Sequence, residues 1–119
     1  MTKYLLLITE KESDYDDSNE AQFNEVMAMH QDFAKAVAES GATLLGGEAL
    51  LPTATAKYLR GTRTEGVHVV DNPAPELKEV LGGYYLIETD DEAKALDLAK
   101  LCPAPYGYIE VRPIWDFGA

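Results

Sequence analysis

The sequence predicts an α+β fold of the ferredoxin-like type, in which two helices cover one face of a mainly antiparallel sheet. The first observation behind this prediction is the order of the segments, a β-α-β-β-α-β pattern with an extra hairpin between its two middle strands. The second is size, since 119 residues with 46% hydrophobic content are enough for one core. We therefore expect one domain over residues 1–119.

The first strand and the acidic segment after it are clear in the sequence. Residues 3–9 form a nearly continuous apolar run, typical of a central strand that is covered on both faces or lies at a subunit contact. Residues 10–20 carry six acidic side chains but lack the turn glycine and the terminal glutamate of a calcium loop. A solvated loop is the better interpretation.

A long helix is expected over residues 20–40. Asn19 and Gln22 have the spacing of a capping pair, and Gly41 is a natural C-terminal stop. His30 falls in the middle of the apolar stripe and should face the sheet, where it is either a satisfied core histidine or a catalytic one. The stripe consists of Phe23, Val26, Met27, Phe33, Ala34 and Val37.

Residues 42–51 read as a second strand that is interrupted by Gly46 and Gly47. Paired glycines inside a strand usually indicate a bulge or a close approach by another group. Glu48 follows them directly, and it is either a solvent-facing edge charge or part of a pocket lining.

Two short strands over residues 55–60 and 66–70 form the extra hairpin. Asp71 follows at a corner where Pro73 fixes the backbone, an arrangement that presents one carboxylate in a defined direction. Residues 75–81 are expected to make one or two helical turns.

The strand over residues 83–88 should place Tyr84 and Leu86 on one face and Tyr85 and Ile87 on the other. Because helices cover only one face of such a sheet, the other face stays open with apolar side chains. A homodimer formed through the open sheet face would cover them.

The C-terminal third completes the pattern. Thr89 and Glu92 have capping-box spacing, which predicts the second helix over residues 90–101. Residues 108–115 form the last strand, and Pro113 makes it an edge or bulged strand.

Composition narrows the function classes. A net charge of -11 without a basic cluster disfavours nucleic-acid binding, and no apolar run is long enough for a membrane span. The single Cys102 excludes an internal disulfide and suits the cytoplasm. Two histidines and one cysteine do not favour a metal site, and the absence of a dinucleotide or phosphate fingerprint predicts no cofactor.

The stretch around the Asp71 corner resembles the YCII-related, or DGPF-domain, family of small bacterial proteins. The family motif is Asp-Gly-Pro-Phe-Ala-Glu-Thr-Lys-Glu before a Leu-Gly-Gly-Tyr-Tyr-Leu-Ile strand, and residues 71–79 read Asp-Asn-Pro-Ala-Pro-Glu-Leu-Lys-Glu before the same strand at 81–87. The sequence departs from the motif at two positions, where Asn72 replaces the glycine and Ala74 replaces the phenylalanine. Asparagine still tolerates the backbone of such a corner, and the loss of the phenylalanine ring leaves more room in the pocket. The likeness extends to residues 3–4, 46–48, 50, 52–55 and 109–113.

The resemblance implies a dimeric α+β barrel and a His-Asp pair, here His30 and Asp71. One hypothesis is a cofactor-free enzyme of the isomerase, lyase or dehydrochlorinase type, with His30 as general acid or base and Asp71 orienting its ring. The alternative is a non-catalytic module that binds a metabolite or docks a protein partner. The sequence leaves both open, and in either case the small-molecule pocket would be lined by Glu48, Pro73, Lys78 and Tyr84.

Overall fold

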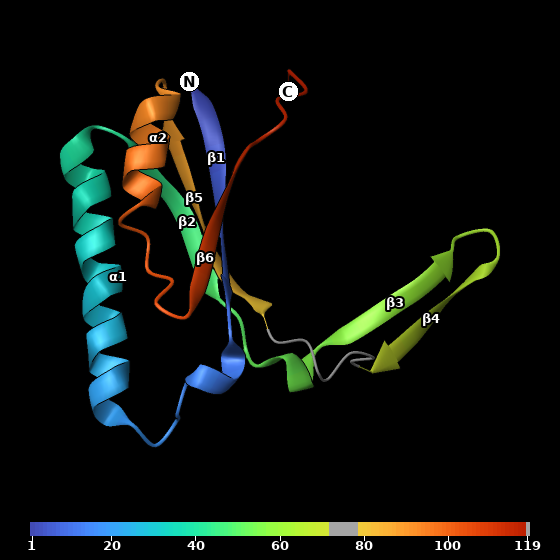
Figure 1. Cartoon of the computed structure of the whole chain (residues 1–119). Coiled ribbons are helices and arrows are strands. Elements are labelled where there is room, and N and C mark those ends of the chain that lie inside the picture. The colour runs from blue at the N-terminus through green and yellow to red at the C-terminus, as the bar shows by residue number, and fades with distance from the viewer. Residues whose placement is uncertain (72–78, 119) are drawn as a thin grey trace.

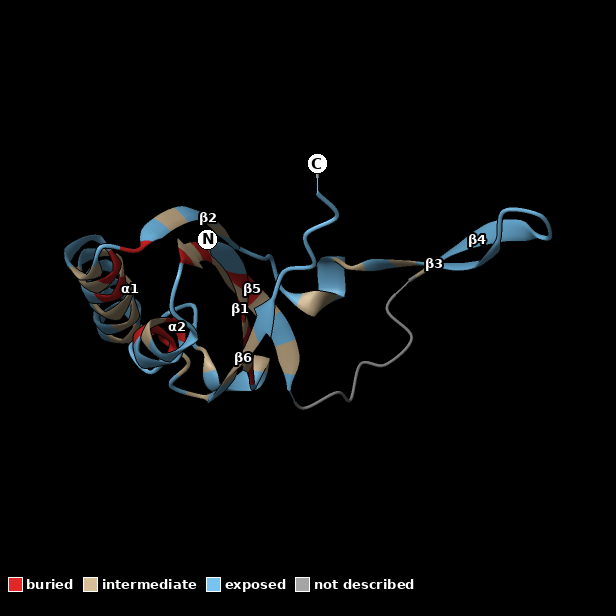
Figure 2. Ribbon diagram, turned by 90° about the horizontal axis from the view of Figure 1, so that it is seen from above, coloured by how far each residue is buried: buried red, intermediate tan, exposed pale blue. Residues whose placement is uncertain are grey.

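The computed structural model describes residues 1–71 and 79–118, and only the backbone of Asp71. Its main sheet has four strands in the order β2-β5-β1-β6, and every neighbouring pair is antiparallel. Both helices lie on one face of this sheet (Figures 1 and 2). This is the ferredoxin-like order, and it confirms the predicted α+β fold class. The elements of this layer are β1 (Thr2–Glu10), α1 (Glu20–Ser40), β2 (Thr43–Ala49), β5 (Val80–Thr89), α2 (Glu92–Ala99) and β6 (Gly107–Pro113).

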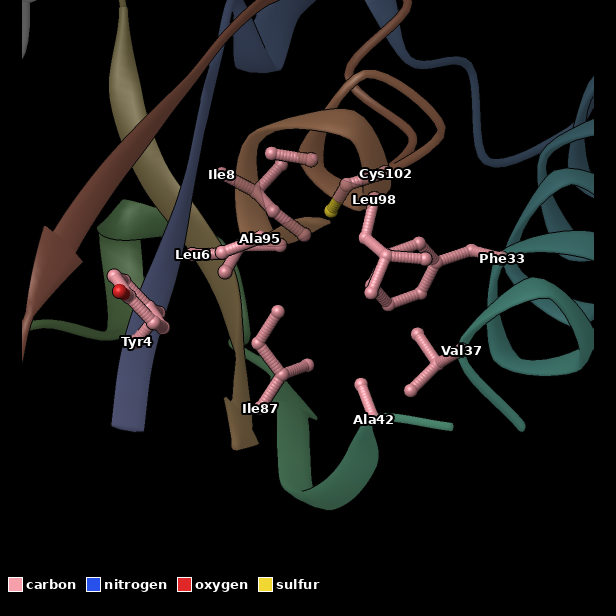
Figure 3. Close-up of a cluster of buried hydrophobic side chains, with 11 residues drawn as sticks. Tyr4, Leu6, Ile8, Phe33, Val37, Ala42, Ile87, Ala95, Leu98 and Cys102 are labelled. Atoms are coloured by element: carbon pink, nitrogen blue, oxygen red, sulfur yellow. The ribbon is translucent and has the colours of Figure 1, made fainter. Parts of the chain in front are cut away.

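The core lies between the sheet and the helices (Figure 3). Alternate residues of β1 point into it, so that Leu6 is fully buried while Leu5 and Leu7 are only partly buried on the opposite face. Ile87 of β5 and Phe33 of α1 complete its centre. The buried cluster comprises Tyr4, Leu6, Ile8, Phe33, Val37, Ala42, Ile87, Ala95, Leu98, Ala99 and Cys102.

The ends of α1 are where the sequence predicts them. The side chain of Asn19 accepts a hydrogen bond from the backbone N–H of Gln22, and Gly41 ends the helix with a left-handed backbone. The predicted apolar stripe is buried only in its C-terminal half. Phe23 and Met27, in the first two turns, remain 63% and 42% exposed because they face a cleft instead of the core.

The predicted bounds of the second helix and of the strand before it were wrong. The second helix is shorter than expected because Asp91, not Thr89, caps it by accepting from the backbone N–H of Ala93. Thr89 is instead buried as the last residue of β5. That strand also begins earlier than predicted, since Val80 and Leu81 pair with β1 and do not belong to helical turns. Glu79, just before the strand, is a bend, and residues 75–78 of the predicted helical segment lie outside the described residues.

The strands β3 (Lys57–Thr62) and β4 (Gly66–Asp71) form a two-stranded sheet of their own. This hairpin projects away from the main sheet on the side opposite the helices (Figures 1 and 2). Gly61 and Gly66 flank its turn with positive φ angles that side-chain-bearing residues rarely adopt. Two short 3₁₀ helices, η1 (Glu12–Asp14) and η2 (Thr53–Thr55), follow β1 and β2 in the chain. Within the described part of the chain, no helix is long and apolar enough to cross a membrane.

Candidate functional site

A cleft of about 880 Å³ opens beside the first turns of α1 and the end of the main sheet. The segment between β1 and α1 forms one side of it, and the chain leaving β2 forms another. Its lining combines apolar side chains with carboxylates. The volume matches that of pockets which hold metabolite-sized molecules. The carboxylates of the lining come from Glu10, Glu12, Asp16, Asp17, Glu20 and Glu48.

His30 and Tyr85 form a hydrogen-bonded pair in this cleft. Nδ1 of His30 lies 2.6 Å from the phenolic oxygen of Tyr85, and the two rings are tilted against each other. Phe33 packs on the other side of the Tyr85 ring, with a centroid distance of 4.6 Å. The helix and the central part of β5 therefore hold both polar rings in one geometry.

Burial sets the protonation state of the pair. It lowers the pKa of His30, an effect that the nearby Glu10 carboxylate opposes, so the imidazole is neutral near pH 7. Burial also raises the pKa of Tyr85, which keeps the phenol protonated. A phenol is a stronger donor than an imidazole N–H, and an imidazole nitrogen is a stronger acceptor than a phenol oxygen. Tyr85 therefore donates to Nδ1, and the imidazole proton resides on Nε2.

The second ring nitrogen of His30 reaches the cleft. Among the described residues, no buried side-chain nitrogen or oxygen lacks a hydrogen-bond partner, and Nε2 makes no hydrogen bond there. Nε2 is therefore accessible to a ligand. A half-buried histidine with one nitrogen fixed and the other accessible has the arrangement that proton transfer requires.

Gly47 makes room for Tyr85. A Cβ at this position would lie 2.5 Å from Cδ1 of Tyr85 and 2.9 Å from the backbone oxygen of Tyr84. The ring of Tyr85 thus lies directly against the backbone of β2, where only glycine fits. The strand also carries an irregularity in register between Leu44 and Gly46. Both consequences expected of the paired glycines, a bulge and a close approach, occur here.

Glu10 is a buried carboxylate at the inner end of the cleft, with only 8% of the residue exposed. It accepts hydrogen bonds from the Tyr15 hydroxyl at 2.7 Å and from the backbone N–H of Tyr106 at 3.0 Å. Burial and this bond to Glu10 raise the pKa of Tyr15. The expectation that residues 10–20 form a solvated loop was wrong for Glu10, since the final residue of β1 points to the helix side of the sheet.

Glu12 fastens two walls of the cleft together. Its carboxylate accepts from the backbone N–H and from the hydroxyl of Thr53, both at 2.6 Å. This bridge joins η1 to η2 across 41 residues of sequence. Apolar side chains also border the cleft here, and Leu51 at this edge is 77% exposed.

The structure brings three of the predicted site residues to the cleft, namely His30, Glu48 and Tyr84. Glu48 and Tyr84 are directly paired across β2 and β5. Strand alternation places their side chains on the sheet face opposite Tyr85, so the cleft borders both faces at this end. Asp71 ends β4, and its side chain lies outside the described part of the structure, as do Pro73 and Lys78.

The sequence analysis missed Tyr85, Glu10 and Tyr15 as members of this site. The signal for Tyr85 was only partial, because strand alternation put Tyr84 and Tyr85 on opposite faces without saying which of them meets His30. Glu10 carried no comparable signal, since it is one of six acids in an acidic segment. No cluster of three or more His, Cys, Asp or Glu side chains suited to a metal ion occurs within residues 1–71 and 79–118, aside from the side chain of Asp71, which is not described.

The fold and the cleft define an α+β protein of ferredoxin-like topology, with a histidine-containing cleft at the end of its sheet. Comparison with protein families identifies the family, since the model of the YCII-related domain matches residues 2–118. The chain belongs to this family. Comparison with curated proteins gives no match.

Proposed function

We propose that the protein binds a small organic molecule in the cleft and acts on it by proton transfer through His30, without a cofactor. One observation carries the proposal: Tyr85 fixes Nδ1 of a half-buried, neutral His30 at 2.6 Å while Nε2 reaches the cleft. Nε2–H can donate a proton or a hydrogen bond to a substrate oxygen. The Tyr85 hydroxyl can rotate and accept from Nδ1–H, which would allow Nε2 to take up a proton instead.

The lining favours a neutral or cationic substrate. Six carboxylates border the cleft, while its described lining contains neither lysine nor arginine. An anionic molecule would be repelled at the mouth. Isomerisation, elimination and lactone chemistry can all act on neutral molecules, and each can use a positioned proton-transfer group.

Asp71, Pro73 and Lys78 remain proposed members of the site. The chain returns from the hairpin to Val80 and Leu81, which both line the cleft. The segment that carries the three residues therefore leads directly into the cleft lining. In this proposal Asp71 helps to orient the substrate or His30, and Lys78 and Pro73 contact the substrate beside Glu48 and Tyr84.

A non-catalytic module that binds a metabolite or docks a protein partner is the second candidate. It is supported by exposed apolar side chains in the cleft lining, where Phe23 is 63% and Leu51 77% exposed. Such exposed apolar side chains around a concave surface are typical of binding sites. On this interpretation the bond between His30 and Tyr85 is structural.

We also propose a homodimer through the open face of the main sheet, in the manner of a dimeric α+β barrel. Leu5 is paired with Leu86 and Leu7 with Tyr84 on this face, and none of the four is fully buried. Charged residues such as Glu88 and Glu110 lie towards its edges. An apolar centre with a polar rim is the usual anatomy of a protein interface.

The function is tested by screening neutral metabolites and lactones for binding by thermal shift, and hits for turnover. His30→Gln should leave binding nearly intact and reduce turnover by about 10² to 10⁴-fold. His68→Gln is the matched control, because this second histidine is exposed on the hairpin. Binding without turnover in the wild type would support the module, and equal turnover in wild type and His30→Gln would contradict proton transfer through His30.

A further inference from the structure

The β3–β4 hairpin exposes an apolar face that its own chain leaves uncovered. Leu59 lies directly opposite Val69 in the ladder. Val67 is two residues before Val69 in β4, so its side chain lies on the same face. Leu59 and Val69 are each 66% exposed, and Val67 is 49% exposed. An isolated two-stranded hairpin is marginally stable in water, so this face needs a packing partner.

The dimensions of the chain show how far the hairpin projects. The radius of gyration is 16.6 Å, whereas a compact domain of this length has about 13.5 Å. Strands of six residues extend roughly 20 Å at ~3.4 Å per residue. The hairpin therefore reaches well beyond the surface of the body from which it starts.

The hairpin projects from the main sheet on the side where the open face of that sheet lies. Figure 2 shows the helices on one side of the main sheet and the hairpin on the other. A second copy docked on the open face would therefore lie beside the hairpin. Because facing sheets pack ~10 Å apart, a hairpin of ~20 Å would extend past the second sheet to the level of its helices.

Charge also identifies a second copy as the partner. Lys57, Arg60 and Arg63 of the hairpin are three of only ten basic residues in a chain with a net charge of -11. The body of another copy therefore presents an excess of carboxylates to a segment enriched in basic side chains. Complementary potentials of this kind promote association and fix its orientation.

We propose that, in the homodimer, the β3–β4 hairpin of each copy packs on the body of the other copy through Leu59, Val67 and Val69. The proposal rests on the homodimer through the open sheet face and adds a second, reciprocal contact to it. Two open faces and two hairpins are then covered by one two-fold arrangement. The hairpin is an intermolecular clamp.

Cross-linking tests the contact directly. Thr64→Cys, at the hairpin turn, provides an accessible thiol, whereas the single native Cys102 is buried. This variant is labelled with a benzophenone maleimide, and ¹⁴N and ¹⁵N copies are mixed, allowed to exchange and irradiated. The proposal expects cross-linked peptide pairs in which the hairpin and the body carry different isotopes. Pairs from one isotope only, or no pairs with the body, would overturn it.

Substitutions separate the clamp from the dimer itself. Leu59→Glu with Val69→Glu should raise the dimer dissociation constant in sedimentation by about tenfold or more. Thr62→Glu with His68→Glu adds the same two charges to the other face of the hairpin and should change it by less than about threefold. Equal effects of the two double variants would contradict packing through Leu59 and Val69.

Failure of the clamp, failure of the homodimer and failure of the proposed chemistry at His30 give different experimental results. If Leu5→Glu dissociates the dimer and the Leu59 and Val69 variant does not, the homodimer stands and the clamp is refuted. A monomeric wild type would refute both the homodimer and the clamp. Ligand binding and the effect of His30→Gln are measured separately, so the proposed chemistry is judged on its own.

Discussion

Replacing Gly47 with alanine should disrupt the pair formed by His30 and Tyr85 without touching either residue. The added Cβ would lie 2.5 Å from Cδ1 of Tyr85, whereas carbon atoms in contact are ~3.5 to 4.0 Å apart. The ring must therefore move by about 1 Å. The backbone oxygen of Tyr84, 2.9 Å from the new atom, restricts the directions in which the strand can yield.

The cost of this movement follows from the same contacts. Overpacking typically costs ~1–3 kcal/mol, and loss of the hydrogen bond to His30 adds about 1 kcal/mol. A shift of about 1 Å extends the 2.6 Å separation beyond hydrogen-bond range. For a chain of this length the total lowers the melting temperature by roughly 10 °C.

Calorimetry and NMR measure the two effects. The melting temperature reports the stability loss, and the ¹⁵N shifts of the His30 ring report whether Nδ1 still accepts from Tyr85. Gly46→Ala is a sharp control, because a Cβ there would meet no atom within 4 Å. If both variants melt within about 2 °C of the wild type, or if the His30 signals of Gly47→Ala are unchanged, the close-contact argument is wrong.

Three further predictions concern titratable groups. Glu10→Gln should lower the free energy of unfolding by ~1–3 kcal/mol, because an amide cannot accept both from Tyr15 and from the Tyr106 N–H as a carboxylate does. The same substitution removes a negative charge near His30, so an NMR titration should show a further lowering of the pKa of His30. Because burial already holds the pKa of His30 below 6.5, the unfolded chain takes up this proton first as the pH falls. Denaturant titrations should therefore show stability falling below pH 6.5 and levelling off below the folded pKa, and the drop should shrink in His30→Gln. Burial raises the pKa of Cys102 to about 12, so a thiol reagent at pH 8 should modify the native chain far more slowly than the unfolded one; equal rates would refute this assignment.

The helix α1 shows how well local rules determine an element. Its start, its stop and the inward direction of His30 follow from Asn19, Gly41 and the 3.6-residue period, and the structure agrees with each. The same period could not separate Phe33 from Phe23, which share one stripe. Only the position of the sheet decides that Phe33 is buried in the core while Phe23 lines a cleft.

The second helix shows where local rules compete. Thr89 with Glu92 and Asp91 with Ala93 are both acceptable starts, and the sequence pattern favours the capping box. The structure uses Asp91 because β5 retains Thr89 as a buried residue that pairs with Thr2 of β1. Tertiary burial of one side chain thus moves the helix boundary by two residues.

Tyr84 and Tyr85 show the same limit at the candidate site. Strand alternation predicts that they face opposite ways, and the structure agrees, but it does not say which one meets His30. That outcome depends on Gly47 of β2, which precedes Tyr85 by 38 residues in the sequence. Only a residue without a Cβ at this position lets the Tyr85 ring lie against β2. A sequence argument that takes the paired glycines and the paired tyrosines together, as the two sides of one close contact, would have placed Tyr85 and not Tyr84 beside His30.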